Sequence, residues 1–291
     1  MRMRFYNNPV LSSELKIRMR GWKTALGIIS YLGVMVFIAF LYYITFIQSS
    51  LAWNRSVNAN QQAGISIYTM LAVLQFILIL LVTPAQTAGS ISSEREKQTL
   101  DLLLCTQLSS FGIIIGKLLS SMSHMLLLIV SSLPLFSIIF LFGGVTPGDM
   151  IMLFSFYIIT AIAVGSIGIF FSTIFKRTVT ATVVTYLTMF ALGLISIILS
   201  AYLMNIYYLH GGSASYVPFP LYINPAAGLA NILQNQISGG SGGILGLGTG
   251  YQTSFWIYNS ITMLVIAGLL VLISIIRINP VNRLFSWKKN S

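Results

Sequence analysis

One stretch of the chain gathers charged side chains between two long apolar runs. It holds Glu94, Arg95, Glu96, Lys97, Asp101 and Lys117. Ser93 and Glu96 have the Ser-x-x-Glu spacing of a capping box, and acidic residues favour the positive end of a helix. Lys97 and Asp101 stand one helical turn apart and can form an ion pair. The spacing predicts a short charged helix, which serves either as a solvated connection or as a docking surface for a soluble partner.

A glycine-lysine sequence in the same stretch has only a superficial likeness to a phosphate-binding loop. Three residues, rather than four, separate Gly112 from Gly116, and Leu118 stands where the motif requires Ser or Thr. The chain has one cysteine and two histidines, so neither a disulfide within the chain nor a metal cluster is expected. We therefore expect no catalytic residue, no metal site and no cofactor on this chain.

The composition indicates that lipid surrounds most of the chain. Charged residues make up 7% of the 291 residues, against roughly 25% in soluble domains. The hydrophobic fraction of 56% is more than a soluble core of this size can bury. A soluble enzyme, a nucleic-acid-binding protein and a disordered protein are thereby excluded. Since a helix needs about 20 apolar residues to cross a bilayer, we expect an all-α membrane protein with six spans, at 25–47, 65–85, 118–142, 150–175, 179–205 and 255–276.

The basic residues indicate how these spans are oriented. The chain has 16 Lys and Arg, and all but Arg55 fall on one side when the six spans alternate across the bilayer. The positive-inside rule places that side, with both termini, in the cytoplasm of a plasma-membrane protein. The net charge of +11 is therefore an orientation signal, and attraction to anionic lipid headgroups is a secondary effect.

Residues 1–24 are expected to form a helix on the cytoplasmic membrane surface. Asn8-Pro9 has the pattern of an N-cap followed by proline at the first helical position. Apolar side chains then recur at helical spacing on one face and basic side chains on another: Leu11, Leu15, Met19 and Trp22, then Lys16, Arg20 and Lys23. This pattern is typical of an interfacial amphipathic helix, although a plain basic flank of the first span has a similar composition.

Four short segments resemble the permease subunits of type-2 ATP-binding-cassette (ABC) exporters. Residues 87–104, TAGSISSEREKQTLDLLL, resemble the family's I-S-x-E-x-x-x-x-T-L-E/D-x-L-L pattern after the second span. Residues 113–119, IIIGKLL, resemble its entry to the third span, and residues 8–20, NPVLSSELKIRMR, resemble its N-terminal helix. Asn224-Pro225 is similar to the Asn-Pro found before the family's last span. The order of these segments agrees with the six-span layout over nearly the full length.

The resemblance implies a larger complex. In this family a six-span half pairs with a second half, identical or related, and each half binds a cytosolic ATPase subunit that hydrolyses ATP-Mg. Segment 86–117 would hold the coupling helix that inserts into the ATPase, through Glu94, Arg95, Glu96, Lys97, Gln98, Thr99 and Asp101. The N-terminal helix would lie beside it, through Glu14, Lys16, Arg18 and Arg20. The chain would then be the membrane subunit of an exporter, and the alternative is a sensor or immunity subunit without net transport.

Polar residues within the spans are candidates for lining a passage, namely Gln75, Thr83, His124, Thr182 and Thr185. Small polar residues also join helices in lipid, so helix packing explains them equally well. His124 has no acid in any span with which to form a proton relay, and a neutral, hydrogen-bonded histidine is expected. The apolar and hydroxyl-bearing spans suit an amphipathic peptide, a lipid-like molecule or a drug. Pro134, Gly165 and Gly168 are expected to kink or closely pack the third and fourth spans.

The connection before the last span, residues 206–254, has no Lys, Arg, Asp or Glu and is rich in Gly, Tyr and Pro. The resemblance implies that part of it folds back as short re-entrant helices that cap an extracellular gate. Asn224 and Pro225 would start one such helix, which would run through Leu233. The alternative is a flexible neutral loop.

Overall fold

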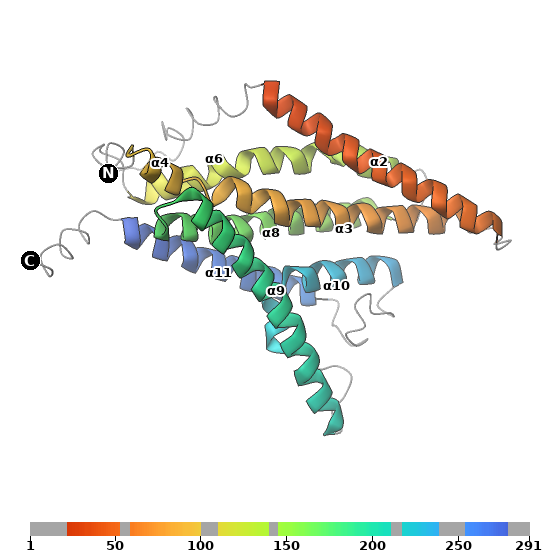
Figure 1. Ribbon diagram of the computed structural model, residues 1–291. Coiled ribbons are helices and arrows are strands. Elements are labelled where there is room, and N and C mark those ends of the chain that lie inside the picture. The colour runs from red at the N-terminus through yellow and green to blue at the C-terminus, as the bar shows by residue number, and fades with distance from the viewer. Residues whose placement is uncertain are drawn as a thin grey trace, which may run out of the picture.

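The computed structural model describes residues 22–52, 59–99, 110–139, 145–210, 217–238 and 254–278 (Figure 1). Within these residues every regular element is a helix: α2 (Trp22–Ala52), α3 (Ala59–Thr87), α4 (Ser92–Glu96), α6 (Ser110–Ser131), α7 (Leu133–Ile139), α8 (Pro147–Ile174), α9 (Thr178–Leu209), η2 (Phe219–Ile223), α10 (Pro225–Ser238) and α11 (Phe255–Ile278). Six helical segments in this described part are long and apolar enough to cross a membrane. The predicted all-α, six-span fold class is confirmed.

The third span differs most from its predicted bounds. Helix α6 begins at Ser110, eight residues before the predicted start at 118, so Lys117 lies inside the helix. The charge of Lys117 is tolerated there because the side chain pairs with Glu94. The helix then breaks at Ser132, and α7 resumes one residue before Pro134. An interruption here is what Pro134 is expected to cause, since proline cannot donate the amide hydrogen bond that a continuous helix needs; a kink stays a prediction.

Helix α8 is the centre of the bundle. It packs against α3, α6, α9, α10 and α11, and its buried residues lie on all sides of the helix. A Cβ atom added to Gly168 would lie 2.0 Å from Oγ1 of Thr87 at the end of α3. Only glycine therefore allows α8 and α3 to approach this closely, which confirms the close packing predicted at this position.

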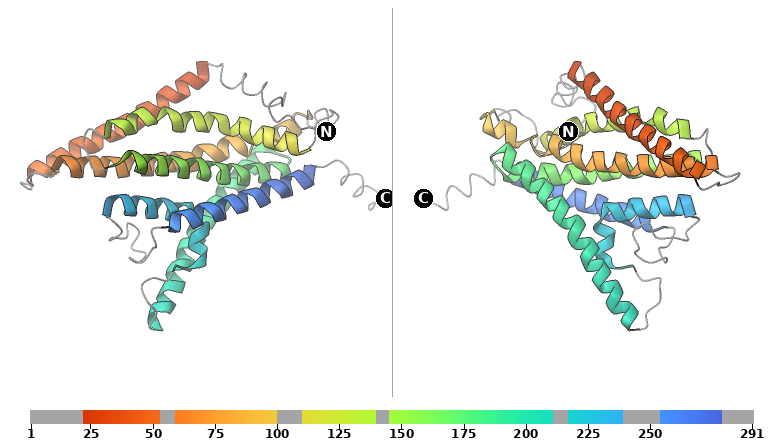
Figure 2. Two further views of the ribbon diagram at one scale, coloured as in Figure 1. Left: turned by 180° about the vertical axis from the view of Figure 1, so that it is seen from behind. Right: turned by 45° about the vertical axis from the view of Figure 1, so that its right-hand side comes forward.

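Helices α2 and α9 lie at the outside of the bundle. Figures 1 and 2 show α2 crossing α3 obliquely, and α9 starting beside α4 and diverging from α8 and α11 along its length. Large apolar side chains of both helices are exposed, including Phe37 of α2 and Leu187 of α9. Apolar surface of this kind is what lipid or a second membrane subunit covers.

The described charged side chains gather at one end of the bundle, which we call the charged end. It includes α4, Lys117 of α6, Lys176 and Arg177 in the α8–α9 connection, and Arg277 near the end of α11. Asp149 lies at the opposite end, in the first turn of α8. The one-sided charge agrees with the predicted alternation of spans. The predicted N-terminal helix up to residue 21, Arg55, Asp101 and the basic residues Arg283, Lys288 and Lys289 lie outside the described residues, whereas Trp22 begins the long helix α2.

Candidate docking site at the charged end

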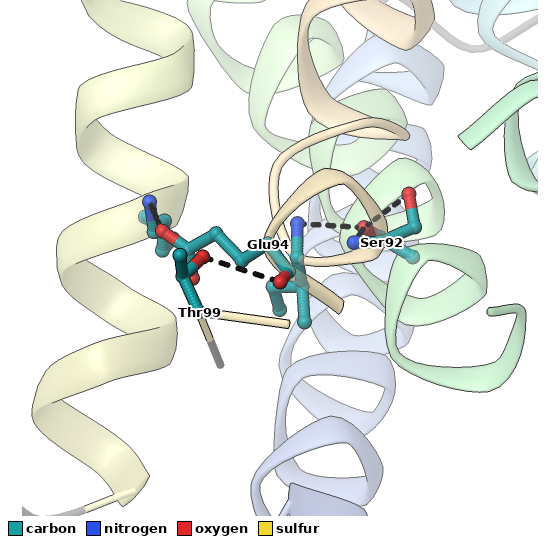
Figure 3. Close-up of polar contacts among 6 residues, drawn as sticks. Ser92, Glu94 and Thr99 are labelled. Carbon is teal, nitrogen blue, oxygen red and sulfur yellow. Dashed lines mark hydrogen bonds and ion pairs between the residues drawn. The ribbon is translucent and has the colours of Figure 1, made fainter. Parts of the chain in front are cut away.

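The start of the short helix α4 is capped by a side chain from another span. The amide N–H groups of Ile91 and Ser92 both donate to Oγ of Ser172 near the end of α8, over 2.8 and 2.9 Å (Figure 3). Ile91, Ser92 and Ser172 are all fully buried. The first amides of a helix have no partner within it, so one hydroxyl here satisfies two of them and holds α4 against α8.

The capping box predicted from Ser93 and Glu96 is wrong. Helix α4 starts two residues earlier than this box requires, with Ile91 rather than Ser93 as N-cap, and no side chain of this segment caps it. The carboxylate of Glu96 instead accepts a hydrogen bond from the hydroxyl of Thr178 at the start of α9. Partners from α8 and α9 have therefore replaced the local ones.

Two further contacts attach α4 to the bundle. Glu94 forms an ion pair with Lys117 of α6, and the two side chains are 19% and 8% exposed. The guanidinium of Arg95 donates from Nη2 to the backbone carbonyl of Thr173 over 3.1 Å. Together with the bonds to Ser172 and Thr178, these contacts connect α4 to three spans, α6, α8 and α9. Five residues take part, counting the N-cap: Ile91, Ser92, Glu94, Arg95 and Glu96.

An apolar cluster lies beneath these polar contacts. Ile91 is fully buried with Ile114 of α6, Ile169 of α8 and Ile278 of α11. The helix therefore rests on side chains from three long helices, in addition to its hydrogen bonds.

The other end of α4 turns sharply and faces solvent. The amides of Thr99 and Gln98 donate to the carbonyls of Glu94 and Arg95 over 2.9 and 3.2 Å, which is the Schellman pattern of a helix end. Gln98 occupies the left-handed region with φ of 57°, a position that usually favours glycine. Glu96, Lys97, Gln98 and Thr99 are exposed, and we call these four residues the α4 tip.

The structure divides the seven predicted docking residues into two groups. Glu94 and Arg95 turn toward the bundle and make internal contacts, whereas the four residues of the α4 tip are accessible. Asp101 and the predicted neighbours Glu14, Lys16, Arg18 and Arg20 lie outside the described residues. Sequence reasoning missed Ser172 and Thr178, because a hydroxyl near the end of an apolar span gives no sign of a partner about 80 residues away. It also missed Thr173, whose contact is made by the backbone carbonyl and is independent of residue type.

The five residues predicted to line a passage lie on different helices and make separate contacts. Gln75 is fully buried and accepts a hydrogen bond from the hydroxyl of Tyr31. The hydroxyls of Thr182 and Thr185 donate to carbonyls of their own helix, over 3.0 and 2.7 Å. Thr83 is buried and His124 is half-buried. Their role in lining a passage stays a prediction.

Asn224 joins three helices far from the charged end. Its Oδ1 accepts from the amide of Ala226 at the start of α10, and its Nδ2 donates to Oγ of Ser196 on α9, over 2.9 and 2.8 Å. Nδ2 of Asn259 on α11 donates to the backbone carbonyl of Asn224 over 3.0 Å. The predicted helix start at Asn224-Pro225 is confirmed, and α10 runs to Ser238, beyond the predicted Leu233. A re-entrant path and an extracellular gate stay predictions.

Comparison with known proteins agrees with this arrangement. The model of the family described as ABC-2 family transporter protein matches residues 47–277, more than half of the chain. The match includes α4, its anchors on α6, α8 and α9, and the Asn224 contacts, and it leaves out residues 8–20. No curated protein matches the chain. With its six apolar helices, the chain belongs to the ABC-2 transporter family, as a membrane-spanning permease subunit.

Proposed function

We propose that the chain is the membrane half of an ATP-driven exporter, and that α4 is the coupling helix that receives a cytosolic ATPase subunit. ABC-2 permeases work with ATPase subunits, so ATP-Mg would bind to that separate chain. A second half, identical or related, would complete the passage, and the charged end would face the cytoplasm from a plasma membrane. An amphipathic peptide, a lipid-like molecule or a drug is the proposed cargo.

The anchoring of α4 is the observation that supports this proposal most directly. The α4 tip is exposed, yet the same short helix is bonded to Ser172, Thr173 and Thr178 and paired with Lys117. A push on the tip would therefore act on α6, α8 and α9 together. A merely solvated connection between spans needs no such set of attachments, so the geometry favours force transmission.

Lys97 offers a clean test of docking, because it is exposed and lies in the α4 tip. We expect Lys97→Glu to weaken co-purification of the ATPase subunit with the chain from mild detergent, whereas Lys97→Arg keeps the charge and should retain it. Glu94 and Glu96 are less suitable, since reversing them also breaks internal contacts. Equal retention of the ATPase by both Lys97 variants would contradict docking at the tip.

Transport is tested separately in reconstituted vesicles with the ATPase bound. ATP-dependent movement of a fluorescent amphipathic peptide or lipid analogue is the expected result. ATP hydrolysis that responds to such molecules without moving any of them would favour the sensor function instead.

A further inference from the structure

A cavity of about 500 Å³ lies between α9 and the helices from which it diverges. Its walls come from α3, α8, α9, α11 and the junction of η2 with α10. On α9 the lining residues include Tyr186, Met189, Gly193 and Ile197, which recur at helical spacing and therefore share one face. Figures 1 and 2 show α9 leaving the bundle along this stretch.

The cavity presents almost no free polar group to an occupant. Tyr186 and Asn224 are its polar lining side chains, and both are engaged. The hydroxyl of Tyr186 donates to the carbonyl of Leu81, and the side-chain amide of Asn224 bonds to Ser196 and Ala226. A water molecule needs two to four polar partners, and a charged headgroup needs more, so the cavity suits hydrocarbon.

The length of the cavity matches one hydrocarbon chain. Tyr186 and Ile197 are 11 residues apart, which is about 16 Å along a helix at 1.5 Å per residue. One leaflet of a bilayer core is about 15 Å thick, half of about 30 Å. Tyr186 is 8 residues from Thr178 at the charged end, or about 12 Å along α9. Because α9 runs obliquely to the other helices, the wall residues of α3 and α8 give a better measure of depth (Figure 1). Leu81 and Ile167 lie about 9 and 10 Å from the charged ends of their helices, Thr87 and Ile174, so the cavity spans the middle of the bilayer core.

We propose that this cavity is a lipid site, occupied by one acyl chain of a phospholipid, with the headgroup outside it. The bound chain acts as a spacer that keeps α9 apart from α8 and α11. An empty apolar space of this size would leave its lining without van der Waals partners, which is unfavourable. This proposal goes beyond the exporter function and does not depend on it.

A second permease half would cover a different face of α9. Leu187, Ile195 and Ile198 point away from the lining residues on the helical wheel and are 66%, 60% and 66% exposed. These side chains are available to a neighbouring subunit. The cavity lies on the inner face, between α9 and its own bundle.

Photolabelling of the full-length chain in vesicles tests the proposal. The vesicles contain phosphatidylcholine with a diazirine in the middle of one acyl chain, and labelled residues are mapped by mass spectrometry. Met263 of α11 is the reporter, because it lines the cavity but is only 4% exposed in the structure. We expect Met263 to be labelled, which requires an acyl chain inside the cavity.

Filling the cavity should remove this label. A Cβ on Gly193 would meet nothing within 4 Å, so Gly193→Phe adds a ring to open space while the backbone contact with Asn224 is kept. We expect labelling of Met263 to fall about tenfold, equivalent to about 1.4 kcal/mol of binding. Gly193→Leu should give a smaller fall, and it preserves the test if the larger ring disturbs folding. Gly268→Phe on α11 is the matched control, since Gly268 also faces open space but does not line the cavity.

Three results would overturn the proposal. If Met263 is labelled no more strongly than a buried residue of the core, such as Met125, then no acyl chain enters the cavity. An equal label in the Gly193→Phe and Gly268→Phe variants would place the chain elsewhere. Cross-links from Met189 of one isotopically distinct copy to Met263 of another would assign the cavity to a second copy of the protein.

Discussion

Replacing Ser172 by alanine tests whether α4 is held to the bundle by a hydroxyl from α8. The variant removes the oxygen that accepts from the amides of Ile91 and Ser92, and both donors are fully buried. A buried amide left without a partner costs about 1–3 kcal/mol, so two cost about 2–6 kcal/mol. Because α4 has only five residues, we expect it to detach from the bundle, while the long helices stay folded.

Amide hydrogen exchange followed by mass spectrometry measures this detachment directly. Even the lower figure of about 2 kcal/mol corresponds to about 30-fold faster exchange of the α4 amides through local opening. In a complex with the ATPase subunit, the same variant should hydrolyse ATP with transport reduced, since the tip then moves without α8.

Ser166→Ala is the matched control for this experiment. Ser166 is also fully buried on α8, but its hydroxyl donates to the carbonyl of Ile162 in its own helix. Its removal leaves no orphan donor on another element. Ser172→Thr keeps the hydroxyl and should retain most of the protection. If the α4 amides exchange equally fast in the Ser172→Ala and Ser166→Ala variants, Ser172 does not hold α4.

Three other predictions follow from the same geometry. Reversing either charge of the Glu94–Lys117 pair should lower the free energy of unfolding by about 2 kcal/mol or more, because two like charges then face each other in a half-buried place. The double variant Glu94→Lys/Lys117→Glu restores opposite charges and should recover much of the loss. Equal melting temperatures for the single and double variants would contradict this. Gln98→Val should make the α4 tip easier to cleave by protease than Gln98→Gly, since a left-handed conformation costs a non-glycine residue about 1–2 kcal/mol; similar cleavage rates would speak against the turn. Gly168→Ala should lower the melting temperature, because overpacking costs about 1–3 kcal/mol, whereas Gly268→Ala, which faces open space, should leave it unchanged; a stable Gly168→Ala variant would show that α8 and α3 are less closely packed.

Two segments of this chain with the spacing of a capping box show the limit of local sequence patterns. Thr146 and Asp149 form one at the start of α8, where the amide of Thr146 donates to Oδ2 of Asp149 over 2.9 Å and the amide of Asp149 donates to Oγ1 of Thr146 over 3.3 Å. Ser93 and Glu96 have the same spacing and form none. In the first pair, Oδ2 of Asp149 accepts hydrogen bonds from both the amide and the hydroxyl of Thr146, so the acid is used locally. The second lies against α8 and α9, where Thr178 binds the acid.

Local sequence patterns were sufficient to predict the six spans, their charged end and the position of the short helix. These properties depend on local hydrophobicity and charge, which act residue by residue against lipid and water. Local patterns also located the start of α10 at Asn224-Pro225, because an asparagine cap and a proline act within a single turn.

Which residues hold α4, and where α9 leaves the bundle, depend on packing between helices that are distant in the chain. Ser172 is an ordinary hydroxyl in an apolar run until folding brings it to two unpaired amides. Glu94 and Arg95 make contacts inside the bundle, whereas the α4 tip is exposed, and this difference likewise depends on helices distant in the chain. The membrane spans are specified by the preference of each residue for lipid or water, which can be read locally. Side-chain partners are specified by how the helices pack, and packing brings together residues that are far apart in the sequence and show no local sign of their contact.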